Sequence, residues 1–192
     1  DLLSLCRNQG WAPDLVVGHS AGVAIALRMW ELGMRPKRGI VGINAALGNF
    51  KGVAGWLFPI MAKALAVTPF SASIFASTTT PASIRNLVKG TGSQLDQEGL
   101  DLYYRLAKDK GHVDATLSMM SQWSLDGLLA RLDKVDCPVH LITGLSDKAV
   151  PPHVSTDAVR TLTNARLTEL PNLGHLAHEE DPETIAQLIL DT

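Results

Sequence analysis

One serine of the chain stands in a pattern that is typical of a nucleophile. The pentapeptide Gly18–Gly22 reads Gly-His-Ser-Ala-Gly, and it joins an apolar run to an apolar helical pattern. At a sharp turn from a strand into a helix, the side chain of Ser20 would point out above a sheet. Gly18 and Gly22 carry no side chains that would collide where strand and helix approach closely. The pattern predicts that Ser20 attacks a carbonyl group and that the N–H of Ala21 donates a hydrogen bond to the oxyanion.

A serine hydroxyl attacks efficiently only when a base removes its proton and a third group orients that base. Asp147 follows the apolar run Val139–Thr143 after a short loop, and His175 follows the run Arg166–Leu170 in the same way. The carboxyl ends of parallel strands meet at one edge of a sheet, where active sites collect. We therefore expect His175 to act on Ser20 as the general base, with Asp147 orienting the imidazole.

Other residues compete for two of these roles. Ser20 could be an ordinary N-cap, because serine is favoured at the start of a helix. Asp136 and Asp157 are rival acids. Asp136 precedes its strand and Asp157 falls within the next helical pattern, so Asp147 is the better placed of the three.

The second histidine of the same region, His178, competes with His175. Gly174 favours His175 because a glycine frees the loop to aim that imidazole. The stretch 178–181 reads His-Glu-Glu-Asp and could suggest a metal site. A better explanation is that these acidic residues are exposed to solvent just before the last helix, where negative charge interacts favourably with the helix dipole. Gly90–Gly92 lacks the third glycine of a dinucleotide site and predicts a turn. Structural or surface roles are predicted for the other histidines, which are His19, His112, His140 and His153.

The elements that position these residues alternate between strands and helices. Asp14–Gly18 and Gly39–Asn44 are apolar throughout, as in parallel strands covered on both faces. Ala21–Leu32 is apolar nearly all round and is followed by Gly33, which predicts a deeply packed helix. The other expected elements are a helix closed by Gly10, strands at Val139–Thr143 and Arg166–Leu170, a helix around Ser155–Leu162 and a helix from about Pro182 to Leu190.

Helical periodicity interrupts this alternation between about Leu47 and Ala130, with helices expected at Glu98–Lys108 and His112–Trp123. We predict an α/β fold in which residues 1–46 and 131–192 form a mostly parallel sheet flanked by helices, and residues 47–130 form a helical cap insert. Large apolar side chains at helical spacing more often form the core of such an insert than contact a ligand. An insert that covers a site also shapes its pocket, so we predict a bulky apolar ligand. The large apolar residues of the insert are Phe50, Trp56, Leu57, Phe58, Met61, Met119, Met120 and Trp123.

The chain order Ser20, Asp147, His175, with the serine at a strand-to-helix turn, resembles the α/β-hydrolase superfamily. The resemblance extends from the helix before the nucleophile strand to Thr192. It implies a serine hydrolase that acts on ester or related bonds without a cofactor or a metal. In that superfamily several strands precede the nucleophile strand, and a loop after the third supplies a second oxyanion donor. We therefore expect this chain to be the carboxyl-terminal portion of a longer protein.

A narrower resemblance is carried by five segments, which are Gly18–Gly22, Ile43–Phe50, Leu87–Leu106, Gly111–Leu125 and Leu173–Pro182. In these segments the chain resembles the magnesium-chelatase accessory proteins of bacteriochlorophyll biosynthesis, the BchO type. The resemblance implies a role in making magnesium tetrapyrroles, with a porphyrin as the candidate ligand and magnesium chelatase as a candidate partner. Two alternatives stay open: a non-catalytic accessory protein that binds a porphyrin or docks on the chelatase, and a generic esterase or carbon–carbon bond hydrolase.

The composition excludes several other classes of protein. Seventeen Lys and Arg against nineteen Asp and Glu give a net charge of −2, which argues against nucleic acid as a partner. Cys6 and Cys137 fit no zinc or disulfide spacing, which favours the cytoplasm. The apolar stretch Val53–Val67 is short for a membrane span and is broken by Pro59 and Lys63, so no transmembrane segment is expected. This stretch could still lie at a membrane surface, peripheral to photosynthetic membranes.

Overall fold

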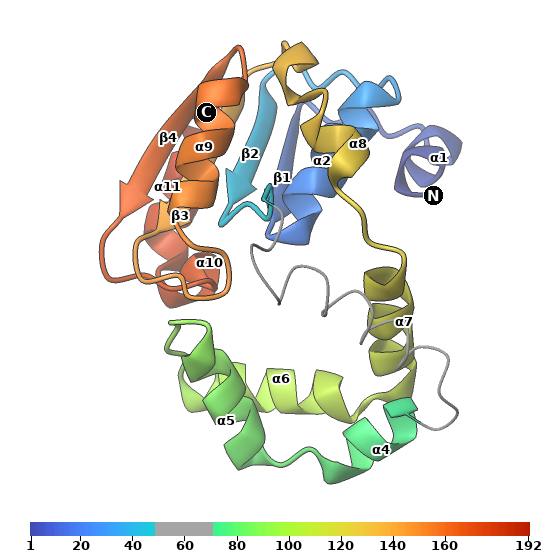
Figure 1. Ribbon diagram of the computed structural model, residues 1–192, viewed down its shortest axis with the longest axis vertical. Coiled ribbons are helices and arrows are strands. Elements are labelled where there is room, and N and C mark those ends of the chain that lie inside the picture. Colours follow the sequence, from blue (N-terminus) through green and yellow to red (C-terminus); the bar gives the residue numbers. More distant parts are fainter. Residues whose placement is uncertain (49–70) are drawn as a thin grey trace. The chain divides into compact units, whose positions relative to one another are not determined.

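The computed structural model describes residues 1–48 and 71–192, apart from the side chain of Ser71. The chain divides into two compact units (Figure 1). The first contains residues 1–48, 91–93 and 125–192, and the second contains residues 49–90 and 94–124. The short segment 91–93 thus belongs to the first unit although both of its neighbours in the chain belong to the second.

A four-stranded parallel sheet forms the centre of the first unit. Its strands lie in the chain order β1-β2-β3-β4, and every neighbouring pair is parallel. This confirms the predicted α/β class with a parallel sheet. The strands are β1 (Leu15–His19), β2 (Gly39–Ile43), β3 (Val139–Gly144) and β4 (Ala165–Leu170).

Helices cover both faces of this sheet. Val41 and Ile43 of β2 belong to one buried cluster with Ile185 of α11. Gly42 lies between them in the strand and so faces the other side, where a Cβ on it would meet Val23 of α2. The helices of the first unit are α1 (Leu2–Asn8), α2 (Ala21–Glu31), α8 (Asp126–Leu129), α9 (His153–Thr161), α10 (Ala177–Glu180) and α11 (Pro182–Leu190), with a 3₁₀ turn at Leu132–Lys134.

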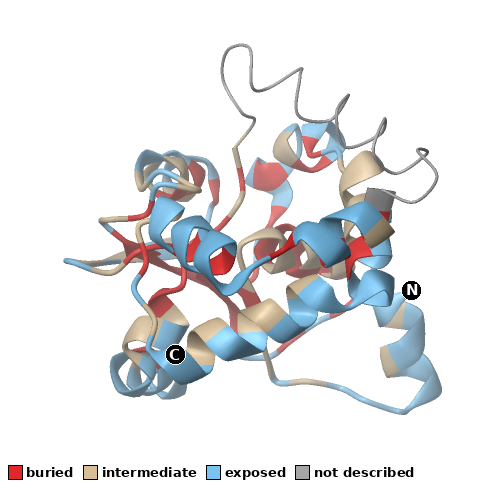
Figure 2. Cartoon of the chain, turned by 90° about the horizontal axis from the view of Figure 1, so that it is seen from below, coloured by how far each residue is buried: buried red, intermediate tan, exposed pale blue. Residues whose placement is uncertain are grey.

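Burial differs sharply between the strands, as the colours of Figure 2 indicate. Every residue of β2 and β3 is buried, whereas Val17 of β1 is 45% exposed. The difference follows from position, because β1 is an edge strand of the described sheet and pairs only with β2. The apolar pattern of the sequence, which predicts a strand covered on both faces, therefore applies to β2 and β3 more fully than to β1.

The described part of the second unit is helical. Its helices begin earlier than the periodicity predicts because aspartates cap them: Asp96 accepts from Gly99 N and Asp109 from His112 N, each at 2.8 Å. The helices are α4 (Ser71–Thr78), α5 (Pro81–Gly90), α6 (Gln97–Lys108) and α7 (Lys110–Ser121).

Part of the predicted cap insert lies outside the described residues. This applies to the possible interfacial stretch Val53–Val67 and to five of the large apolar residues of the insert, which are Phe50, Trp56, Leu57, Phe58 and Met61. The division into residues 1–46, 47–130 and 131–192 stays a prediction. Within residues 1–48 and 71–192, no helix has the length and apolar character needed to cross a bilayer.

Candidate active site

Ser20 lies in the turn that links β1 to α2, and its backbone is in an unusual conformation. Its φ is +52° and its ψ is −118°, values that a residue with a side chain rarely adopts. Ser20 N donates to Ile43 O at 2.9 Å, which ties the turn to the end of β2. The N–H of Ala21 is one of the first N–H groups of α2, which a helix leaves without partners of its own.

The two glycines of the pentapeptide differ in what they permit. A Cβ on Gly18 would lie 2.6 Å from the carbonyl carbon and oxygen of Gly22, so only glycine fits at position 18. A Cβ on Gly22 would meet no atom within 4 Å. The expectation that both glycines avoid a collision through their missing side chains is therefore wrong for Gly22. At this turn the backbone carbonyl of Gly22 lies against Gly18, and it leaves no room for a side chain at position 18.

Two hydrogen bonds connect the predicted serine, histidine and aspartate. His175 Nε2 lies 3.0 Å from Ser20 Oγ, and His175 Nδ1 lies 2.8 Å from Asp147 Oδ2. A carboxylate oxygen only accepts, so Nδ1 carries the proton and Nε2 is free to accept from the serine hydroxyl. This tautomer is the one that general-base catalysis by Nε2 requires.

The carboxylate of Asp147 is held at both of its oxygens. Oδ1 accepts from Ala149 N and Val150 N, each at 2.8 Å, within its own loop. Oδ2 accepts from His175 Nδ1 and also from Asn44 Nδ2, the latter at 2.7 Å. Asp147 is only 5% exposed, so these four donors stand where water would otherwise solvate the charge.

Asn44 is a site residue that the sequence analysis missed. It directly follows β2, is fully buried and has a φ of +48°, a conformation that asparagine tolerates better than most residues. Its amide nitrogen also donates to Gly174 O at 3.2 Å. Its position after a buried strand, next to the same sheet edge as Asp147 and His175, was the signal available in the sequence.

His19, the residue before the serine, makes a hydrogen bond to the loop that carries His175. Its Nε2 donates to the carbonyl oxygen of His175 at 2.8 Å, and its ring centroid lies 4.4 Å from that of His178. Burial is the main cause that lowers the pKa of His19 to about 4, and the nearby His178 and His175 act in the same direction. His19 is therefore a neutral hydrogen-bond donor at physiological pH.

His178, which competes with His175 in the sequence, and the acidic residues 179–181 make other contacts in the structure. His178 Nε2 lies 3.6 Å from Glu179, and burial lowers the pKa of its imidazole. Glu180 turns back to accept from Gly174 N at 2.8 Å, and Asp181 caps α11 by accepting from Thr184 N. In the described part of the chain, no group of three or more His, Cys, Asp or Glu could hold a metal ion.

The two rival acids and the buried histidine His140 have other surroundings. Asp136 is exposed ahead of β3, and Asp157 is in α9 with its carboxylate 3.3 Å from Arg160. His140 is buried within β3, where Nε2 lies 2.8 Å from Thr168 Oγ1 and Nδ1 lies 3.1 Å from a guanidinium nitrogen of Arg166. Burial and the Arg166 charge lower the pKa of His140, which fits a structural histidine.

Comparisons with known proteins identify the family and the fold of this chain. The alpha/beta hydrolase family matches residues 1–188 of the chain. The chain belongs to this family. The magnesium-chelatase 30 kDa subunit of Rhodobacter capsulatus is 43% identical over 192 residues, all of this chain, and the chain spans 66% of the length of that relative. The predicted resemblance to the α/β-hydrolase superfamily and, more narrowly, to the magnesium-chelatase accessory proteins is thereby confirmed.

Solved structures establish the same fold for this hydrolase-family chain. An esterase from Exiguobacterium antarcticum superposes with a TM-score of 0.74 at 14% identity, covering 100% of this chain and 70% of the esterase. An alpha/beta hydrolase fold protein from Burkholderia ambifaria gives 0.74 at 20% identity, covering 98% and 69% of the two chains. At such low identities the likeness shows the fold alone.

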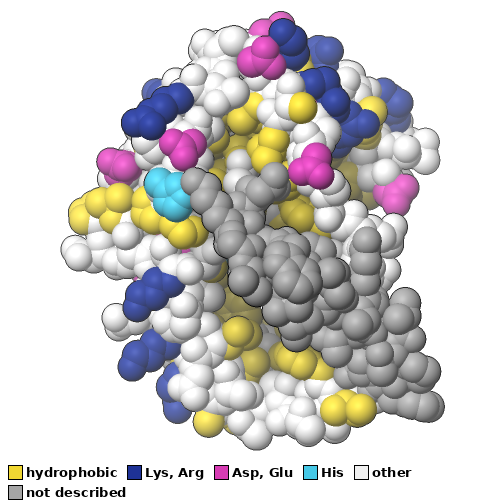
Figure 3. All heavy atoms as spheres, viewed as in Figure 1, with side chains coloured by type: hydrophobic (Ala, Val, Ile, Leu, Met, Phe, Trp, Pro, Cys, Tyr) yellow, Lys and Arg dark blue, Asp and Glu magenta, His cyan; other side chains and the backbone are white. Residues whose placement is uncertain are grey.

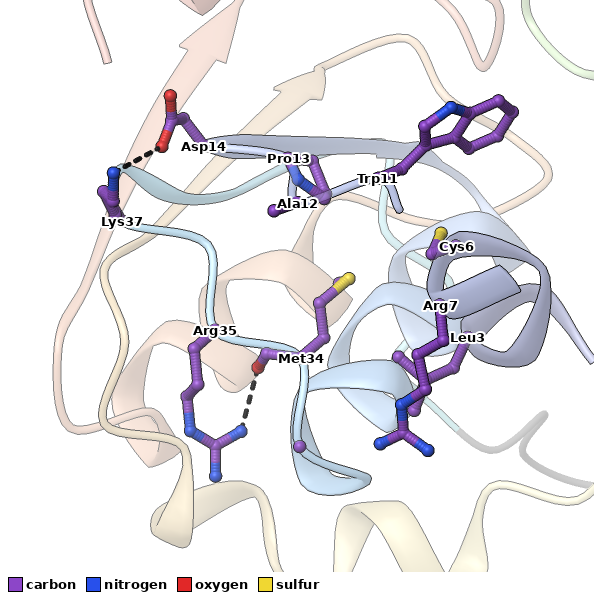
Figure 4. Close-up of a pocket in the computed structure, with 11 residues that line it drawn as sticks. Leu3, Cys6, Arg7, Trp11, Ala12, Pro13, Asp14, Met34, Arg35 and Lys37 are labelled. Atoms are coloured by element: carbon purple, nitrogen blue, oxygen red, sulfur yellow. Dashed lines mark hydrogen bonds and ion pairs between the residues drawn. The ribbon is translucent and has the colours of Figure 1, made fainter. Parts of the chain in front are cut away.

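A pocket of about 250 Å³ in the first unit lies at the opposite ends of the strands (Figure 4). Asp14 directly precedes β1 and Lys37 lies just before β2, and these two side chains form an ion pair of 3.6 Å at one side of the pocket. Arg35 donates to the carbonyl oxygen of Met34 at 2.8 Å. Because Ser20 follows β1, this pocket is at the other edge of the sheet and is not the place where substrate would meet the serine.

The surface of this family member carries charges of both signs. Figure 3 shows Lys and Arg side chains and Asp and Glu side chains on the same face of the described chain. This agrees with the net charge of −2.

Proposed function

We propose that the protein containing this chain is a serine hydrolase that cleaves an ester or a related acyl bond. One observation carries the proposal: the Ser20 hydroxyl, the His175 imidazole and the Asp147 carboxylate are joined by hydrogen bonds of 3.0 and 2.8 Å. They supply a nucleophile, a base and a group that orients the base. Membership of the alpha/beta hydrolase family supports the same reaction type.

In the first half of the reaction, Ser20 Oγ attacks the carbonyl carbon of the substrate while His175 Nε2 takes the hydroxyl proton. The imidazolium that forms is stabilised by Asp147, whose carboxylate is already in contact with Nδ1. The negative charge on the carbonyl oxygen is stabilised by the N–H of Ala21 at the start of α2. His175 then gives its proton to the leaving group as the acyl–serine bond remains.

In the second half, a water molecule attacks the acyl group and His175 Nε2 takes its proton. The bond to Ser20 Oγ breaks, the serine recovers a proton from the imidazole and the acid product leaves. A serine at this turn argues against epoxide hydrolase or haloalkane dehalogenase chemistry, in which the same fold uses an aspartate as nucleophile.

The pathway proposed for this reaction is the synthesis of magnesium tetrapyrroles, in the cytoplasm or at the surface of photosynthetic membranes. The 43% identity with a protein named as a magnesium-chelatase subunit supports it. A bulky apolar ligand, with a porphyrin as the candidate, would suit the large apolar side chains of the predicted insert. Among the described residues, Met119 of α7 is 44% exposed and so accessible to such a ligand.

A second function deserves testing because the same relative is named as a chelatase subunit and not as a hydrolase. In this alternative the protein is an accessory protein that binds a porphyrin or docks on magnesium chelatase, and its serine is not used. The fold and the hydrogen bonds at Ser20 would then be inherited without a catalytic role.

The experiment uses the full-length protein with Ser20→Ala, and with Ser4→Ala as a matched control on the exposed surface of α1. A serine-directed phosphonate should label the wild type and Ser4→Ala but not Ser20→Ala. Pigment formation should fall with Ser20→Ala only if hydrolysis serves the pathway. Absence of labelling in the wild type would contradict the hydrolase proposal, and lost labelling with intact pigment formation would favour the accessory role.

A further inference from the structure

A three-residue segment from the middle of the chain lies against both loops of the candidate site. Thr91, Gly92 and Ser93 lie between α5 and α6 in sequence but belong to the first compact unit. The sequence predicts only a turn there. None of the three is part of the hydrogen-bonded set at Ser20, so their placement calls for a separate explanation.

The segment contacts the loop that carries Asp147. Lys148 N donates to the carbonyl oxygen of Thr91 at 3.0 Å, one residue after the carboxylate. Gly92 has a φ of +88°, and a Cβ on it would collide with the carbonyl oxygen of Ser146. Backbone therefore packs directly on backbone on both sides of Asp147, which leaves this loop little room to move.

The same segment contacts the loop that carries His175. Leu176 N donates to Ser93 Oγ at 2.8 Å, and Ser93 is only 1% exposed. On the other side of the histidine, a Cβ on Gly174 would lie 2.5 Å from Ser93 N. The imidazole of His175 thus extends from a backbone that the segment contacts both before and after it.

We infer that Thr91–Ser93 is a positioning segment, and that Ser93 in particular fixes the alignment of His175 with Asp147. The two loops also contact each other, through Ser146 N and the carbonyl oxygen of Leu173 at 2.9 Å. Asn44 Nδ2 also bridges them by donating to Asp147 Oδ2 and to Gly174 O. The segment adds one further hydrogen bond to each loop beyond these contacts. Ser93 acts through Leu176 N and touches no reacting atom, so it is a positioning residue.

As far as catalysis is concerned the inference rests on the proposed function, because alignment affects rate only if His175 serves as the base. The test uses the full-length protein with Ser93→Ala, which leaves the buried N–H of Leu176 without its acceptor. Ser93→Cys keeps the volume but is a weak acceptor, and it decides the question if Ser93→Ala does not fold. Ser93→Thr keeps the hydroxyl and tests for rescue. Ser155→Ala, at a serine that is also 1% exposed but lies in α9, is the matched control.

Two readouts distinguish positioning from a general loss of stability. Hydrolysis of a p-nitrophenyl ester should show kcat reduced by about tenfold to a hundredfold in Ser93→Ala, as for a small misplacement of a catalytic group. KM should stay within about twofold, because Ser93 does not contact substrate. Ser93→Thr should recover most of the lost kcat, and Ser155→Ala should keep the wild-type value.

The second readout does not depend on turnover. The proton between His175 Nδ1 and Asp147 Oδ2 should give a downfield ¹H NMR resonance in the wild type and in Ser20→Ala. It should broaden or vanish in Ser93→Ala and Ser93→Cys. An unchanged resonance together with an unchanged kcat in these two variants would overturn the inference, and so would an equal loss in Ser155→Ala. If the wild type shows no Ser20-dependent hydrolysis, the proposed function fails, while the resonance still decides whether Ser93 aligns the pair.

Discussion

Asn44 and His175 donate hydrogen bonds to the same oxygen of Asp147. Asn44 Nδ2 lies 2.7 Å from Oδ2, and His175 Nδ1 lies 2.8 Å from it. The amide of Asn44 is fully buried, and its oxygen has no partner among the described residues. Turning the amide over would place that oxygen against the carboxylate, so the charge of Asp147 fixes the orientation of Asn44. The asparagine in turn fixes where the carboxylate can meet the imidazole.

Replacing Asn44 should therefore lower kcat without a comparable change in KM. Asn44→Ala removes one donor from a buried carboxylate, and a hydrogen bond to a charged group contributes about 1.5–3 kcal/mol, or roughly tenfold or more in rate. Asn44→Asp should be worse at neutral pH, because two carboxylates in contact would have to share a proton. Ester hydrolysis by each purified variant measures the effect. Equal rates for Asn44→Ala and the wild type would count against this role.

Asp147→Asn should reduce kcat by about 10⁴-fold, because it imposes the wrong tautomer on His175. Ala149 N and Val150 N both donate to Oδ1, so the oxygen of the new amide would keep that place. Its NH₂ group would then face His175 Nδ1, which could only accept, and the imidazole proton would move to Nε2 opposite Ser20. Single-turnover acylation measures this step directly. A loss below about tenfold would mean that Asp147 is not the group that orients the imidazole.

The sequence contained enough information to predict most of the elements around Ser20. The helix Pro182–Leu190 was predicted with its observed bounds, and β2 and α2 end within one residue of prediction. Apolar periodicity, glycine stops and the Gly-x-Ser-x-Gly turn are local signals, so they can be read without knowing the fold. Chain order then places Asp147 and His175 at the same sheet edge as Ser20.

The contacts that hold the site together could not be predicted in this way. Asn44 is 103 residues from Asp147 in the chain, and Ser93 is 83 residues from Leu176. Each of them makes a hydrogen bond whose geometry depends on how distant loops pack, and a single asparagine or serine leaves no periodic pattern. The sequence does not distinguish the roles of Gly18 and Gly22 for a similar reason, since which of the two backbones faces the other depends on how the strand packs on the helix.

Stability should depend on pH through His19. Burial lowers the pKa of its imidazole from 6.5 to about 4, so above pH 6.5 His19 is neutral in both the folded and the unfolded chain. Between pH 6.5 and about 4 the unfolded chain binds a proton that the folded chain does not. The free energy of unfolding should therefore fall as the pH falls, by up to about 1.4 kcal/mol per pH unit from this group.

Urea unfolding between pH 4.5 and 7.5 measures this slope. His19→Gln keeps an N–H that can donate to the carbonyl oxygen of His175 but does not titrate, so its slope should be shallower. His112→Gln, at an exposed position in α7, should keep the wild-type slope. His178 and His140, whose pKa values are also lowered by burial, should both contribute to any slope that persists in His19→Gln. Identical slopes for His19→Gln and the wild type would show that His19 titrates alike in both states.

The two glycines of the pentapeptide should respond oppositely to alanine. Gly18→Ala places a Cβ 2.6 Å from the backbone of Gly22, where neither the strand nor the helix can withdraw without loss of packing, so unfolding should require about 3 kcal/mol less. Gly22→Ala meets no atom within 4 Å and restricts the unfolded chain, so unfolding should require about 0.4–1 kcal/mol more. Thermal and urea unfolding of both variants provide the comparison. Equal destabilisation would mean that the approach of β1 to α2 at this turn is not what excludes a side chain from position 18.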